Sequence, residues 1–230
     1  MRVVVALPFH GVFGVIYAAL AAALAPLSAA AMVDVLKATG IHPAAALLIA
    51  MSMTFFSLAA SPINVVVYTV SRRHYIPVVD YVVVLGIPIP VPRVALHEEK
   101  SYIAVNVGGA VVPLAVATYL LAKIYSPHLV AAIAAASLLT YSVSRVIPSV
   151  GVVTPAFAPP IIAALSALIA GGGPAATYVT AVYGTIIGAD LMNMRKILSH
   201  RPPLVSIGGA GVFDGIYLSG LLATLLSKLL

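Results

Sequence analysis

The sequence predicts an all-α membrane protein of about seven transmembrane helices, with a small cytoplasmic β-structured insertion between spans two and three. Composition supports this fold class, because 62% of the residues are hydrophobic, only 8% are charged and the mean hydropathy is +1.13. Soluble domains carry roughly 25% charged residues. The length of the apolar runs supports it too, since about 20 apolar residues cross a bilayer. We therefore expect one polytopic domain, residues 1–230, as a multi-pass protein of the cell membrane.

The expected spans are long apolar runs with few interrupting charges. The fifth is the shortest of them and has three prolines around its start, Pro155 just before it and Pro159 and Pro160 within it. The seven runs are residues 12–35, 44–60, 106–124, 129–144, 156–170, 175–194 and 207–229.

Residues 62–105, between the second and third spans, have a different composition. Val, Ile and Tyr dominate, and Pro, Gly and charged residues separate short apolar runs. This pattern is typical of strands and hairpins. Unpaired strand edges cannot face lipid, so we expect the segment on one membrane face. Residues 145–155 look similarly extended and are a candidate to join it.

Basic residues predict the orientation, because they concentrate on the cytoplasmic side of membrane proteins. Seven spans would place nine of them on one side and three on the other, with the N-terminus and residues 62–105 cytoplasmic. The nine are Arg2, Arg72, Arg73, Arg93, Lys100, Arg145, Arg195, Lys196 and Arg201, and the three are Lys37, Lys123 and Lys228.

The remaining polar residues exclude several classes of site. The chain has no Cys, so it has no disulfide and no thiolate metal site. Its six His residues show no metal-ligand spacing, and we expect no metal and no cofactor. The basic residues flank spans, so we expect no nucleic-acid partner. Asp34 precedes Lys37 by three residues, which predicts an ion pair at a helix end.

Two carboxylates, Asp190 and Asp214, stand out because each lies in a run apolar enough to cross a bilayer. Placing Asp at the centre of a membrane helix costs about 2.5–3.5 kcal/mol. Neighbouring antiparallel spans would bring both residues to a similar depth. Two carboxyl groups in contact share a proton, so the ionised one can deprotonate water while the protonated one polarises a carbonyl. We therefore predict Asp190 and Asp214 as a catalytic pair.

Small and amide residues around these carboxylates are predicted to support the site or to bind substrate. Gly184 and Gly188 share a helix face, and residues 206–211 open the last span with three glycines. Contact between these two glycine faces is the favoured interpretation, with substrate contact as the alternative. The predicted supporting residues are Gly188, Asn193, Gly208, Gly209, Gly211 and Asn106.

The chain resembles an uncharacterised family of archaeal and bacterial polytopic proteins, catalogued only as a domain of unknown function. Five stretches carry this resemblance and cover most of the chain. They are SPINVVVY, YIAVNVGGAVVPL, IPSVGVVTPAFAPPIIAAL, GTIIGADLMN and SIGGAGVFDGIYLSG.

The two Asp-bearing stretches also partly resemble presenilin, signal peptide peptidase and, more distantly, prepilin peptidases. Those intramembrane aspartyl proteases carry one Asp on a span and a second in a Gly-x-Gly-Asp motif on the next. Here Gly211 stands three residues before Asp214, but Phe213 replaces the second glycine. Ala189 replaces the Tyr that precedes the first Asp in those families. The resemblance implies hydrolysis of a membrane-embedded peptide.

Three functions remain open at this point. The first is an intramembrane di-aspartyl protease that cleaves membrane-embedded peptide segments near the cytoplasmic face. The second is a proton- or cation-coupled transporter or channel that uses the same carboxylates. The third is a structural membrane scaffold. The expected partners are membrane lipid and a membrane-protein or peptide substrate, and Ala- and Gly-rich helix faces also suit a homo-oligomer.

Overall fold

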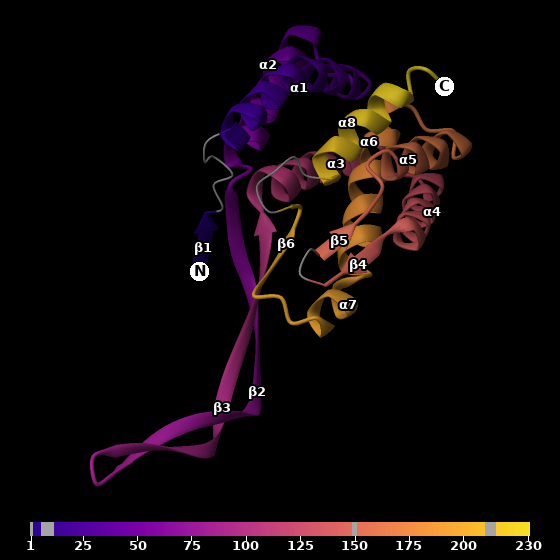
Figure 1. Cartoon of the computed structure of the whole chain (residues 1–230). Coiled ribbons are helices and arrows are strands. Elements are labelled where there is room, and N and C mark those ends of the chain that lie inside the picture. Colours follow the sequence, from indigo (N-terminus) through magenta and orange to yellow (C-terminus); the bar gives the residue numbers. More distant parts are fainter. Residues whose placement is uncertain (1, 6–11, 149–150, 210–214) are drawn as a thin grey trace.

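The protein combines a bundle of helices with a mixed β-sheet (Figure 1). The computed structural model describes residues 2–5, 12–148, 151–209 and 215–230. The helices are α1 (Val12–Lys37), α2 (Pro43–Ala60), α3 (Val112–Ile124), α4 (Pro127–Val143), α5 (Ala158–Ile169), α6 (Pro174–Thr185), α7 (Met194–Ser199) and α8 (Gly215–Leu226), with π-helical turns η1 (Val107–Val111) and η2 (Ile186–Leu191).

A four-stranded sheet makes the prediction of an all-α fold wrong. Its strand order is β1-β2-β3-β6, in which β2 pairs antiparallel with β1 and β3, and β6 runs parallel to β3. Residues 145–155 do not join this sheet, because β4 and β5 pair only with each other. The strands are β1 (Arg2–Val5), β2 (Ile63–Val84), β3 (Ile87–Asn106), β4 (Arg145–Ile147), β5 (Gly151–Val153) and β6 (Leu204–Ile207).

The described residues do not contain the seven membrane-spanning helices that hydropathy predicts either. Within the described residues, two helical stretches are long and apolar enough to cross a bilayer, Pro43–Ala60 and Val107–Ile124. Each has 18 residues and a mean hydropathy of 1.8. At 1.5 Å per residue, each is about 27 Å long, close to the thickness of the hydrocarbon core.

Local backbone chemistry explains why three of the other expected spans are shorter helices than predicted. The run 156–170 becomes the 12-residue α5, which is only about 18 Å long. The run 175–194 changes at Ile186 from α6 to the π-helical η2. The run 207–229 begins with the last residue of β6, and its helix starts at Gly215. Hydropathy reports apolar residues but does not report these changes of backbone conformation.

The core lies around α6, which packs against α3, α4, α5 and α8. Val179 and Val182 of α6 are fully buried. Small residues from the neighbouring helices, such as Ala136 and Ala223, allow close approach. By contrast, the large apolar side chains of α2 point outward and are exposed, as expected of a helix that faces lipid. They include Leu48, Phe55 and Phe56.

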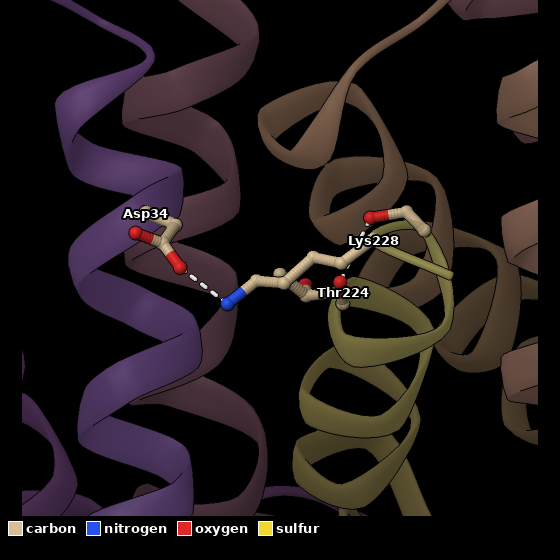
Figure 2. A network of polar contacts seen from close by, with 4 residues as sticks. Asp34, Thr224 and Lys228 are labelled. Atoms are coloured by element: carbon tan, nitrogen blue, oxygen red, sulfur yellow. Dashed lines mark hydrogen bonds and ion pairs between the residues drawn. The ribbon is translucent and has the colours of Figure 1, made fainter. Parts of the chain in front are cut away.

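An ion pair links the first long helix to the end of the last one (Figure 2). Lys228 donates to the Asp34 carboxylate, and Ser227 beside it donates to the Thr224 carbonyl. Asp34 thus pairs with a residue 194 positions away, and the predicted pair with Lys37 is wrong. The sequence could not reveal this partner, because it depends on the packing of α1 beside α8.

Strands β2 and β3 form a long hairpin that extends away from the helices and bends to the side near its tip (Figure 1). Its turn, Leu85–Gly86, has positive φ at both residues, as a two-residue type I′ turn requires.

The four prolines of this hairpin all occupy the same kind of cross-strand pair. They occupy the pairs Pro77↔Val94, Val79↔Pro92, Tyr81↔Pro90 and Val83↔Pro88. Because these pairs are two residues apart, all four belong to the same class of antiparallel pair. Pro has no N–H, so that class must be the non-hydrogen-bonded one, whose N–H and C=O groups point out of the hairpin.

The junction between sheet and helices yields a first prediction. A Cβ at Gly108 of η1 would lie 2.0 Å from the Ser57 carbonyl oxygen and 2.5 Å from the Ser61 nitrogen, both backbone atoms. We expect Gly108→Ala to lower the free energy of unfolding by about 3 kcal/mol, because backbone cannot move aside cheaply. Thermal unfolding in detergent micelles would measure this loss.

Gly173→Ala is the matched control, because nothing lies within 4 Å of its Cβ position. We expect this variant to stay within about 0.5 kcal/mol of the parent protein. Equal stability of the two variants would contradict the close contact at η1.

Candidate functional site

A cavity of about 660 Å³ lies where the sheet, the β4–β5 hairpin and the C-terminal helices meet. Both strands of the hairpin and all of β6 line it, together with the end of η2 and the start of α8. Among the charged residues of its wall are Asp190 and Arg201. This cavity is the candidate functional site.

Asp190 is presented to the cavity by η2, the π-helical turn that continues α6. Its side chain is largely buried, and the carboxylate accepts a hydrogen bond from the Gly208 backbone N–H. Asp190 lies outside the two helical stretches that could cross a bilayer. Burial raises the pKa of this carboxyl to about 7, and the hydrogen bond from Gly208 opposes the rise. Asp190 can therefore hold or release a proton near neutral pH.

The predicted partner Asp214 and the predicted supporting residue Gly211 lie outside the described residues. The residues on either side of that segment, Gly209 and Gly215, both line the cavity that contains Asp190.

Gly208 holds a backbone conformation that its position requires. Its φ is +86°, and a Cβ there would lie 2.4 Å from the Ala110 Cβ of η1. A side chain at this position would therefore be strained by the positive φ and would also clash with η1. This contact fixes the N–H group that reaches Asp190.

A buried amide network joins three segments beside the cavity. Asn106 is almost fully buried, and its Nδ2 donates to the Ser61 carbonyl at 2.5 Å and to Asn64 Oδ1 at 3.2 Å. The Asn106 Oδ1 accepts from the Gly109 N–H at 2.7 Å, which caps η1. From β6, the Ser206 hydroxyl lies 2.6 Å from Asn64 Oδ1. The network therefore ties β6, a wall of the cavity, to the base of the hairpin.

The same Ser206 hydroxyl also contacts the carbonyl of Gly209. Its single proton serves one of the two acceptors at a time. Gly209 has φ +86° as well, so β6 is followed by two consecutive residues in a region that favours glycine. The role of Gly208 and Gly209 in this structure is to turn the chain beside Asp190.

The predicted contact between two glycine faces is wrong. A Cβ at Gly184 would meet Ala136, and one at Gly188 would lie 2.3 Å from the Ser137 carbonyl oxygen. Both glycines therefore allow α4 to pack closely against this helix. Gly208 instead meets η1. Asn193 is buried and donates to the carbonyls of Gly188 and Ala189 at 3.3 and 3.0 Å, which satisfies backbone groups freed by the π-helical turn. Neither Gly188 nor Asn193 lines the cavity.

Sequence reasoning missed β6 and two polar residues shortly before it that contribute to the cavity, His200 and Arg201. Arg201 has φ +51°, and its guanidinium lies 3.4 Å from a Glu99 carboxylate oxygen of β3. The run LVSI after two prolines was the available signal for a short strand, but its last residue, Ile207, was counted in the expected seventh span. Within the described residues, no group of three or more His, Asp or Glu side chains is placed to hold a metal ion.

Comparison with known protein families assigns the chain to one of them. A family model described as "Protein of unknown function (DUF1614)" matches residues 58–226, well over half of the sequence. The chain belongs to this DUF1614 family. The match runs from the last turn of α2 to the end of α8, so the matched region of the DUF1614 protein contains the hairpin, η2 and the whole wall of the cavity. No curated protein and no solved structure matches the chain.

The raised pKa of Asp190 predicts how stability depends on pH. Unfolded Asp has a pKa near 4, so between about pH 4 and 7 the folded protein binds more protons than the unfolded chain. The free energy of unfolding should therefore fall as pH rises through this window, by at most about 1.4 kcal/mol per pH unit from this group. Asp190→Asn removes this contribution.

Chemical unfolding of both proteins in detergent between pH 4.5 and 8 would measure the effect. We expect the stability advantage of Asp190→Asn to grow up to about pH 7 and then stay constant. An advantage that does not change with pH would show that Asp190 is not protonated on folding.

Proposed function

We propose that this DUF1614 protein is an intramembrane di-aspartyl protease that cleaves membrane-embedded peptide segments near the cytoplasmic face. Asp190 and Asp214 would be its catalytic pair. The proposal extends the partial resemblance of the two Asp-bearing segments to presenilin and signal peptide peptidase. The observation that carries it is the buried carboxyl of Asp190 in the wall of a cavity large enough for a peptide segment.

The chemistry needs one protonated and one ionised carboxyl group. A pKa near 7 suits Asp190 to the protonated role, in which its O–H donates to the carbonyl oxygen of the scissile peptide. The ionised Asp214 would then take a proton from water as the water oxygen attacks the carbonyl carbon. As the C–N bond breaks, Asp214 gives its proton to the leaving amine nitrogen and Asp190 takes a proton back from a hydroxyl of the tetrahedral intermediate, which restores the starting pair.

Strand β6 supports a peptide as the substrate. It pairs with β3 along one edge, and all four of its residues line the cavity. Peptide hydrolysis requires an extended backbone, and an extended peptide can add to a free strand edge by main-chain hydrogen bonds. A substrate strand beside β6 would run through the cavity toward Asp190.

Charge supports the cytoplasmic side for this site. The two possible spans, α2 and η1–α3, flank the β2–β3 hairpin, so both hairpin ends emerge on one membrane face. The hairpin carries four basic residues, whereas Lys37, at the end of α1 before α2, and Lys123, in the last turn of α3, lie toward the opposite membrane face in this arrangement. The pairing of the N-terminal β1 with the base of β2 supports a position on the hairpin side in this topology. The proposed protein is thus multi-pass, with a cytoplasmic N-terminus.

Cleavage by purified protein in liposomes tests the proposal. The probe is a fluorescently labelled single-span peptide whose helix carries a Gly-Pro pair near its cytoplasmic end, so that it unwinds locally. We expect wild-type protein to cleave it, and both Asp190→Asn and Asp214→Asn to reduce cleavage by about 10³-fold or more, because one carboxylate cannot replace the pair.

Asp34→Asn is the matched control, since it makes the same chemical change at a residue that does not line the cavity. This variant should cleave at the wild-type rate. Cleavage that survives in both site variants would refute the catalytic pair. Proton or cation flux lost in both variants, without any cleavage by wild type, would favour a transporter instead.

A further inference from the structure

The tip of the β2–β3 hairpin exposes an apolar strand edge that a folded monomer leaves uncovered. Val79, Tyr81 and Val83 of β2 are 59%, 68% and 67% exposed, and Leu85 in the turn is 98% exposed. In the described structure β1 covers the outer edge of β2 only at residues 63–66. A two-stranded hairpin with no further support is marginally stable in water, so this tip needs a partner.

The two edges of the tip differ in what they offer such a partner. On β3, the outward positions are Pro88, Pro90 and Pro92, none of which has an N–H group. On β2, the outward positions opposite them are Val79, Tyr81 and Val83, and all three have both N–H and C=O groups facing outward. An added strand can therefore pair with the β2 edge but not with the β3 edge.

We propose that the partner is a second copy of this chain, paired antiparallel through the same β2 edge across a two-fold axis at Tyr81. This inference is independent of proteolysis. In this register Tyr81 faces Tyr81 of the other copy, and Val79 faces Val83. Each of these pairs exchanges two hydrogen bonds. The register uses every available donor of the edge, because Pro77 ends it on one side and the turn at Leu85 ends it on the other.

The side chains of the edge fit a second copy. Antiparallel self-pairing about Tyr81 brings two rings together and places Val against Val on both sides, which are favourable cross-strand pairs. The acidic residue of the segment, Asp80, already forms an ion pair with Arg93 of its own hairpin at 2.8 Å, so two copies do not bring uncompensated charges together.

The prolines also define the size of the assembly. Once two β2 edges pair, the outer edges of the four-stranded ribbon are both the proline-bearing edges of β3. Neither can accept another strand at the tip, so the assembly closes at two copies and does not grow into a fibre.

Stable soluble dimers bury roughly 1,200 Å² or more of surface, and the short paired edge buries less than this. We therefore expect dimers mainly where both copies share one membrane. The experiment therefore uses the full chain in liposomes. The natural sequence has no Cys, so single-cysteine variants report one contact each. Residues in a hydrogen-bonded antiparallel pair have Cα atoms about 5.5 Å apart, which a disulfide can bridge.

Under mild oxidation we expect Tyr81→Cys to form at least about tenfold more disulfide-linked dimer than Val91→Cys, a β3 variant that keeps every proline of the blocked edge. A mixture of Val79→Cys and Val83→Cys proteins should crosslink, whereas neither protein should crosslink alone. Equal crosslinking of Tyr81→Cys and Val91→Cys, or none from Tyr81→Cys, would overturn the proposal.

A second variant separates edge pairing from chance collision. Tyr81→Pro removes one outward N–H and leaves the hydrogen bonds within the hairpin intact. Placed in both Val79→Cys and Val83→Cys proteins, it should abolish their mixed crosslink while thermal unfolding remains unchanged. The proposal would be overturned if these double variants crosslink as strongly as the Val79→Cys and Val83→Cys proteins that keep Tyr81.

Discussion

The close backbone contacts between the base of the sheet and the helices are the constraint on which the site depends. The end of α2 packs against Gly108, and η1 packs against Gly208, each at a distance that a side chain on the glycine would prevent. Asn106 completes the junction by satisfying polar backbone groups that the contact buries. Because Gly208 is fixed in this way, its N–H meets Asp190, so a packing requirement in the sheet sets the environment of a carboxyl group at the end of a helix.

Parts of the fold follow directly from composition, and parts do not. The Val- and Tyr-rich character of residues 62–105 separates them from the helical runs, and this is where β2 and β3 lie. The number of spans was overestimated because hydropathy does not distinguish a continuous helix from an apolar run that changes conformation. Ile207 shows this clearly, since it counts as a membrane residue by hydropathy but ends a strand.

The candidate site was partly visible in the sequence. Asp190 stood out because a carboxyl group among apolar residues needs a reason, and it does line a cavity. The partners of the glycines could not be predicted, because spacing defines a helix face but not its neighbour, and Gly188 contacts α4. The positive φ of Gly208 and Gly209 and the short strand before them depend on contacts with η1 and β3, which lie about 100 residues earlier in the chain.

The position of the hairpin prolines has a consequence for folding. Val and Ile occur on both faces of the tip, so the hydrophobic pattern alone would tolerate a slip of one strand past the other. A one-residue slip would make either the even-numbered or the odd-numbered residues of both strands face inward. It would therefore turn either the nitrogens of Pro88, Pro90 and Pro92 or that of Pro77 into the interior of the ladder, where each would leave a carbonyl without a donor. The prolines thus select a single alignment for a ribbon whose side chains do not specify one.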